Sequence, residues 1–331
     1  MSKKTGLILA KFAPFHNCHR YIIEKALNMV DDLFIIMYDC PNLTRIPLNI
    51  RANWVRKFYP QVNVIEGWDA PNRHEDTPEV KRIQEKFVKT ALNGRKITHF
   101  FSSDFYGEHM SKFLGAKNIR VDLIDKDYKC KMRATLIRND KYFCRMYMDT
   151  LVYRDILINV AFVGIPSKEQ GKIVKKLAEK FSTVYTSDNL LEFIVSRQNL
   201  KKINFYKLAT EKYKKANSSK KIHSGREYLF YDSTGFVDHL LSVATHNQFD
   251  VEMYKFFCED MKKYDIVFVN TSLKNIETAK KLNFDKDIFM NILIKNLETL
   301  GINYKILNGS FGKKVKEAEE VIKSTKIKIN Q

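Results

Sequence analysis

The chain has 331 residues, of which 44% are hydrophobic and 29% are charged, a balance typical of a globular protein with about two domains. This composition excludes a disordered chain, a collagen and a disulfide-dense secreted module. No apolar stretch approaches the roughly 20 residues that a bilayer-spanning helix needs. The N-terminus has a four-residue apolar run after its two lysines and lacks the core of a signal peptide. We therefore expect no membrane partner.

The chain is basic, with 57 Lys and Arg residues against 38 Asp and Glu residues and a formal charge of +19. Such an excess suits nucleic acid or polyphosphate partners. The lysines are spread along the whole chain, however, and no RNA-binding or zinc-finger motif accompanies them. We expect no specific nucleic-acid partner. The five cysteines form no CxxC pair, which favours a reducing cytoplasm over a disulfide framework or a protein metal site.

The first half of the chain predicts alternating strands and helices. Short apolar runs and helical spacing of apolar residues follow one another, as in a parallel α/β sheet. The expected strands span residues 5–12, 32–38, 62–66, 98–103 and 119–124, and the expected helices span 19–29, 50–58 and 79–92.

A second α/β unit begins with the apolar run at 156–165, which is followed by a helix expected at 171–181. Further strands are expected at 228–231, 265–269 and 303–307, and a last helix at 313–324. We place the domain boundary so that the first domain covers residues 1–152 and the second 153–331. The lysine-rich segment 212–221 is expected to be a solvated surface loop or helix end.

Two histidines, His16 and His19, follow the first strand directly in the segment KFAPFHNCHRYII. A helix N-terminus at that point presents free N–H groups and a partial positive charge, which suit a phosphate. Two imidazoles there can donate hydrogen bonds to phosphoryl oxygens. The alternative is a pair of histidines that merely cap or line the start of a helix.

A second candidate phosphate-binding segment is KMRATLIRND, residues 131–140. Thr135 at a helix start can hold phosphate oxygens, and Arg138 one turn later offers a planar fork to them. Ser103 follows the fourth expected strand and Trp68 follows the third, so both are expected at the ligand-binding edge of the sheet. An aromatic plate such as Trp68 could stack on a pyridinium ring.

These segments resemble known motifs. The histidine segment resembles the HxGH signature of adenylyltransferases, and Lys11 and Phe12 match its usual lead-in, whereas Ala10 and Cys18 replace glycines. RATLIR is similar to the family's I-S-x-T-x-I-R segment, with Arg133 in place of serine. The order of features along the chain, including FFSSDFYGEH, ILINVAFVGI and FYDSTGFV, resembles the NadR-like family. That family joins a nicotinamide mononucleotide adenylyltransferase to a nicotinamide riboside kinase.

The resemblance implies an α/β fold in which a Rossmann-like nucleotidyltransferase domain is followed by a P-loop-kinase-like domain. It implies that NAD and pyrophosphate are made from nicotinamide mononucleotide (NMN) and ATP, with Mg²⁺ bridging the phosphates. His16 would orient the ATP phosphates and His19 would bind the α-phosphoryl oxygens. The other implied contacts to ATP and NMN come from Lys11, Phe12, Trp68, Ser103, Thr135 and Arg138. A non-catalytic sensor of NAD or ATP, and transfer to another phosphate ester, remain as alternatives.

The expected phosphate loop of the second domain is damaged. A P-loop reads G-x-x-x-x-G-K-[ST], but here Gly164 and Gly171 enclose two residues too many, and Ile173 follows Lys172 where a hydroxyl should bind metal. The segment YDSTGF, residues 231–236, resembles the family's acidic D-x-D-F motif but keeps one clear carboxylate, Asp232. We expect riboside kinase activity to be lost or very weak, and the domain to serve as a scaffold, a homo-oligomer surface or a nucleotide sensor. A bifunctional enzyme with a working kinase is the competing expectation.

Overall fold

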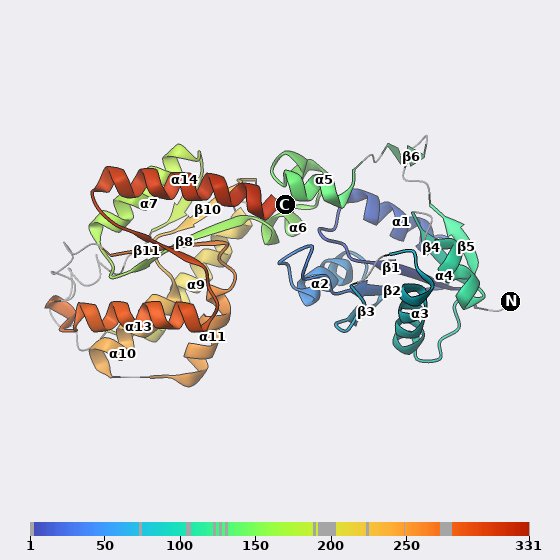
Figure 1. Cartoon of the computed structure of the whole chain (residues 1–331), viewed down its shortest axis with the longest axis horizontal. Helices are drawn as coiled ribbons and strands as arrows, with labels where there is room; N and C mark the ends of the chain where they lie inside the picture. The colour runs from blue at the N-terminus through green and yellow to red at the C-terminus, as the bar shows by residue number, and fades with distance from the viewer. Residues whose placement is uncertain are drawn as a thin grey trace. The chain divides into compact units, whose positions relative to one another are not determined.

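The structure is a computed structural model that describes residues 3–72, 75–103, 107–121, 124–125, 128–129, 132–187, 190, 203–222, 225–247, 249–271 and 280–330. It divides into two compact units, Met1–Ile156 and Leu157–Gln331 (Figure 1). The division falls four residues after the expected boundary, because the short helix α6 (Thr150–Asp155) belongs to the first unit. Among the described residues, no helix is long and apolar enough to cross a membrane.

The first unit is built on a parallel sheet of five strands in the order β3-β2-β1-β4-β5. Its strands are β1 (Thr5–Ala10), β2 (Asp32–Tyr38), β3 (Asn63–Gly67), β4 (His99–Ser102) and β5 (Lys117–Arg120). Its principal helices are α1 (Asn17–Leu27), α2 (Leu48–Phe58), α3 (Pro78–Leu92), α4 (Gly107–Leu114) and α5 (Ala134–Asn139). A two-stranded hairpin, β6 (Ile124–Asp125) and β7 (Tyr128–Lys129), and a 3₁₀ turn, η1 (Phe143–Tyr147), complete the unit.

Successive side chains of each strand point to opposite faces of this sheet, and apolar residues are buried on both faces. Leu7, Ile36 and Phe100 pack with Val88 of α3 and Met110 of α4. Right-handed crossover connections place α1 and α2 on the opposite face, where Ile8 and Ile35 are also buried. The order of the strands means that connections leave β1 and β4 in opposite directions, and in open α/β sheets ligands bind at the carboxyl ends of the strands at such a point.

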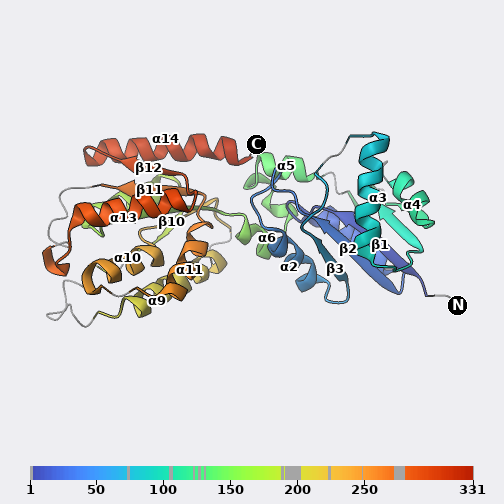
Figure 2. The same ribbon diagram turned by 60° about the horizontal axis from the view of Figure 1, so that its bottom comes forward.

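The second unit is a parallel sheet in the order β12-β11-β8-β10-β9 (Figure 2). Its strands are β8 (Ile158–Gly164), β9 (Val184–Thr186), β10 (Tyr228–Tyr231), β11 (Ile266–Asn270) and β12 (Tyr304–Leu307). Its helices are α7 (Lys168–Lys180), α9 (Phe205–Ile222), α10 (Gly235–His246), α11 (Val251–Met261), α13 (Lys286–Thr299) and α14 (Phe311–Asn330). Helices α7 and α14 cover one face, and α9, α10, α11 and α13 cover the other.

The expected α/β fold class is confirmed, with differences at the ends of some elements. The fifth strand spans Lys117–Arg120 rather than 119–124. Helix α7 begins at Lys168, three residues before the expected start. The lysine-rich segment 212–221 lies inside α9, and its first residue is not solvated: Lys212 Nζ lies 2.7 Å from the buried Asp238 carboxylate.

Candidate functional site

The two histidines lie together at the start of α1. His16 is the N-cap residue of this helix, and the centroids of the His16 and His19 rings are 3.7 Å apart. The backbone N–H of His16 donates to Nδ1 of His19 at 3.3 Å. Since a neutral imidazole has one protonated nitrogen, this hydrogen bond assigns the ring proton of His19 to Nε2. His19 therefore presents an N–H donor on the side away from its own helix cap.

His16 is buried, with 2% of its surface exposed, and among the described residues neither of its ring nitrogens has a hydrogen-bond partner. Burial lowers the pKa of His16 to about 4. Burial, followed by the charge of His16, holds the pKa of His19 well below its usual value. Both rings are therefore neutral at neutral pH. A buried polar group without a partner costs about 1–3 kcal/mol. The buried His16 ring therefore lowers the stability of the fold, which is typical of a residue that is kept to bind a ligand.

Phe12 shapes the turn that leads to the histidines. Its backbone has φ of 45°, in the left-handed region that bulky residues rarely adopt. Its ring is buried and lies 4.5 Å, centroid to centroid, from the ring of His19. The preceding residue, Lys11, has a lowered pKa because it is partly buried, although the neighbouring Cys40 raises it.

The second predicted segment lies against the first. In helix α5, Arg138 donates from its guanidinium to the carbonyl oxygen of Ala13 at 2.7 Å and to Oγ1 of Thr135 at 3.2 Å. Thr135 and Arg133 are exposed. Arg138 thus carries its charge to the turn before His16, although the two segments are more than a hundred residues apart in sequence.

Cys18, which stands where the motif has glycine, is buried in the first turn of α1. Its sulfur takes part in a disulfide bond and lies 3.2 Å from the carbonyl oxygen of Met132. Cys40, Cys144 and Cys258 are free thiols. The cysteine pattern, which favours a reducing cytoplasm over a disulfide framework, does not predict this bond at Cys18. The cysteine fits in this position because its side chain turns toward residue 132, next to α5.

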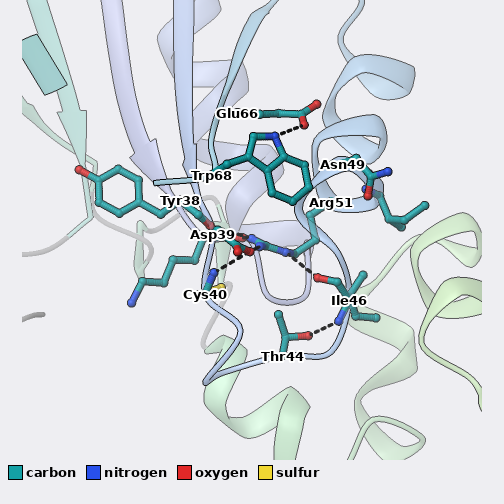
Figure 3. Close-up of polar contacts among 11 residues, drawn as sticks. Tyr38, Asp39, Cys40, Thr44, Ile46, Asn49, Arg51, Glu66 and Trp68 are labelled. Atoms are coloured by element: carbon teal, nitrogen blue, oxygen red, sulfur yellow. Dashed lines mark hydrogen bonds and ion pairs between the residues drawn. The ribbon is translucent and has the colours of Figure 1, made fainter. Parts of the chain in front are cut away.

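Arg51 of α2 organises the same edge of the sheet and was missed by sequence reasoning. It is fully buried and donates to the carbonyl oxygens of Lys11, Tyr38 and Ile46 and to the Asp39 carboxylate (Figure 3). An arginine in the first turn of an amphipathic helix normally indicates a surface charge, and no sequence signal distinguishes this one.

Three cations converge around Cys40, which follows β2. Burial raises the pKa of the Cys40 thiol, whereas the charges of Arg51, Lys11 and Arg138 lower it. The Asp39 carboxylate, which is ion-paired with Arg51, acts in the opposite direction, so three cations and one carboxylate influence the thiol at the carboxyl ends of β1 and β2. Such an excess of positive charge attracts phosphate groups.

The remaining predicted residues lie at the ends of neighbouring strands. Ser103 follows β4 directly and is exposed, whereas the part of its motif at 104–106 lies outside the described residues. Trp68 follows β3 and is 57% exposed. Its indole Nε1 donates to the Glu66 carboxylate at 3.1 Å (Figure 3). Within the described part of the chain, no group of three or more His, Cys, Asp or Glu side chains could hold a metal ion.

In the second unit, Gly164 ends β8 with φ of +141°. A Cβ atom there would lie 2.6 Å from the Asn270 carbonyl oxygen, so only glycine fits. Ser167 then caps α7 by accepting from the Gln170 N–H at 3.1 Å, and the helix begins at once. Gly171 and Lys172 therefore lie within the first turns of α7 rather than in a phosphate loop. Counted from Gly164, the P-loop positions for Gly, Lys and Ser/Thr hold Glu169, Gln170 and Gly171.

The residues between β8 and the first turn of α7 make contacts with other parts of the second unit. Lys314 of α14 is buried, and its Nζ lies 3.3 Å from the Glu169 carboxylate and 2.9 Å from Oδ1 of Asn270. The Gln170 side chain donates to the carbonyl oxygen of Asp232 at 2.6 Å. Asp232 is buried at the end of β10, and its carboxylate would lie 3.1 Å from a Cβ atom at Gly171.

Comparisons with known proteins agree with the resemblance seen in the sequence. No family model matches the chain. It is 25% identical over 207 residues to the trifunctional NAD biosynthesis/regulator protein NadR of Salmonella typhimurium, covering 55% of this chain and 47% of that protein. It is 26% identical over 208 residues to the Escherichia coli protein of the same name, covering 55% and 48%. The chain thus spans about half the length of the curated relatives it matches.

Two crystal structures extend the likeness to the whole fold. NadR protein in complex with NAD and AMP-PNP matches with a TM-score of 0.62 at 14% identity, covering 98% of this chain and 96% of that one. NadR protein in complex with NR matches with the same TM-score and the same coverage at 15% identity. The chain is thus similar to NadR proteins in sequence over about half of its length and in fold over nearly all of it.

Proposed function

We propose that the first unit is a nicotinamide mononucleotide adenylyltransferase, which makes NAD and pyrophosphate from NMN and ATP. The observation that carries the proposal is the buried His16 ring, which has no hydrogen-bond partner among the described residues and lies 3.7 Å, centroid to centroid, from the His19 ring at a strand-to-helix junction. The curated relatives are described as NAD biosynthesis proteins, and one solved neighbour is a complex with NAD and AMP-PNP.

In the proposed reaction, a phosphate oxygen of NMN attacks the α-phosphorus of ATP in line, and pyrophosphate leaves. No protein nucleophile is required, so the protein contributes positioning and charge stabilisation. The Nε2–H of His19 would donate to an α-phosphoryl oxygen as charge develops there, and His16 would orient the phosphates. Lys11 and Arg138 would neutralise the triphosphate and the leaving pyrophosphate, with Thr135 fixing its position.

The remaining contacts are proposed from their places around the edge of the sheet. Phe12 and Ser103 would line the nucleotide, and Trp68 would face the nicotinamide ring. Mg²⁺ would enter with ATP, held by phosphate oxygens, because it retains waters and needs few protein ligands.

The test is NAD formation by the purified full chain and by a His19→Ala variant. We expect turnover to fall on the order of 100-fold or more, as it does when a preorganised transition-state donor is removed. His99→Ala is the matched control, because His99 begins β4 at the opposite, amino-terminal edge of the sheet. Unchanged turnover in His19→Ala would remove His19 from this role. ATP binding without any NAD formation would favour the sensor instead.

We further propose that the second unit lacks riboside kinase activity. Glu169 would repel a triphosphate at the position where a P-loop has glycine, and its partner Lys314 is already engaged. In the other possible alignment, Lys172 would be the phosphate-binding lysine, but Ile173 is then the metal-binding position and is fully buried in the core.

To test this, the full chain is given nicotinamide riboside and ATP, and both NMN and NAD are measured so that onward conversion is counted. We expect no product above that of a reaction without protein. Riboside phosphorylation that disappears in a Lys172→Ala variant would overturn the proposal and restore the bifunctional enzyme.

A further inference from the structure

The indole of Trp68 is exposed but is held in place. Gly67 ends β3 so close to α3 that a Cβ atom there would lie 2.5 Å from the Phe87 ring. Side chains on either side of Gly67 share one face of the strand, which brings Glu66 next to Trp68. One oxygen of the Glu66 carboxylate then accepts from the indole Nε1–H at 3.1 Å.

The other oxygen of Glu66 is bound by Arg56 of α2. The Arg56 guanidinium donates to Oε1 of Glu66 at 2.6 Å and to the Val64 carbonyl oxygen at 3.3 Å. Glu66 is thus clamped between a cation that is anchored on the strand and the edge of an indole ring. A surface tryptophan gains little stability from such an arrangement, whereas a ring that must receive a flat ligand benefits from a fixed orientation.

We propose that Glu66 is a positioning residue that fixes Trp68 for the pyridinium ring of the mononucleotide. The inference rests on the proposed function and deepens it. Donation of the indole N–H to a carboxylate also increases the electron density of the ring. Because a cation is attracted to an electron-rich aromatic face, the arrangement favours the positively charged, oxidised nicotinamide ring over the neutral ring of the reduced mononucleotide.

The experiment compares oxidised and reduced NMN as substrates for the full chain, Glu66→Ala and Glu66→Gln. For Glu66→Ala we expect the KM for oxidised NMN to rise roughly two- to five-fold, the size of one cation–π contact at an exposed ring. The kcat and the KM for reduced NMN should change less. Glu66→Gln keeps an acceptor for the indole and should recover part of the loss, whereas a purely structural role would shift both substrates equally.

Binding without turnover supplies a second readout. The chain has two tryptophans, and Trp54 is buried, so quenching of fluorescence by oxidised NMN that is lost in Trp68→Phe reports on Trp68. Glu66→Ala should weaken this quenching. Glu108→Ala should not, because it removes a carboxylate that is ion-paired with Lys112 on α4, away from β3.

The two hypotheses fail separately. If the unaltered chain makes no NAD, the proposed function is wrong, and quenching still measures the contact with the ring. If NAD is made but Glu66→Ala leaves both the quenching and the ratio of the two KM values unchanged, Glu66 is not a positioning residue.

Discussion

His16 couples the folding of the first unit to pH. Its pKa is about 4 in the folded chain against 6.5 as an ordinary value, because the ring is buried. Between these two pH values the unfolded chain binds a proton that the folded chain does not, so acid favours unfolding. The stabilisation is complete above the unfolded pKa and is lost as pH falls toward 4. At about 1.4 kcal/mol per pKa unit, the loss is about 3 kcal/mol.

We therefore expect the urea midpoint of the first unit to fall between about pH 7.5 and about pH 5, and to fall less in His16→Gln. Tryptophan fluorescence measures it, because Trp54 and Trp68 both lie in this unit. An equal fall in both proteins would show that burial does not lower the pKa of His16 in the folded chain. His19 shifts in the same direction, so some dependence on pH should persist in the variant.

Arg51 connects secondary-structure elements, because its guanidinium joins helix α2 to the ends of β1 and β2 through hydrogen bonds to the Lys11 and Tyr38 carbonyl oxygens. Replacing it with methionine removes the donors for three backbone carbonyls and leaves Asp39 without its ion-pair partner. Because Asp39 is partly exposed, the main cost comes from the carbonyl oxygens that are left without a donor, about 1–3 kcal/mol. We expect Arg51→Met to lower the free energy of unfolding by an amount of that order, measured as a lower urea midpoint, and to weaken ATP binding.

Arg82→Met serves as the control, since Arg82 is exposed on α3 and its loss should leave the midpoint nearly unchanged. If Arg51→Met unfolds at the same urea concentration as the unaltered chain, the guanidinium does not hold these elements together.

The difference between Arg51 and the predicted residues shows what a sequence can reveal. Strands β1, β2 and β8 are continuous apolar runs, and His16, Arg138 and Trp68 stand beside such strands or in recognisable segments. Arg51 and Lys314 are cations inside helices, and their burial depends on carbonyls and carboxylates that are distant in sequence. The early start of α7 did leave a signal: Ser167 and Gln170 have the spacing of a capping box.

At the scale of the whole molecule, the chain consists of two units, each with its own parallel sheet and core. The position of the boundary matters, because Trp54 is buried and donates to the Asp155 carboxylate at 2.8 Å. Val152 and Tyr153 of the same short helix α6 are also buried.

We predict that a fragment of residues 1–156 folds and forms NAD with a kcat/KM close to that of the full chain. A fragment of residues 1–149 lacks α6, so Trp54 loses its hydrogen-bond partner at a cost of about 1–3 kcal/mol, and its apolar neighbours are exposed. Its urea midpoint, followed by tryptophan fluorescence, should be clearly lower. Equal midpoints would mean that α6 is dispensable. Loss of NAD formation in a folded fragment of residues 1–156 would show that the second unit contributes to the first site.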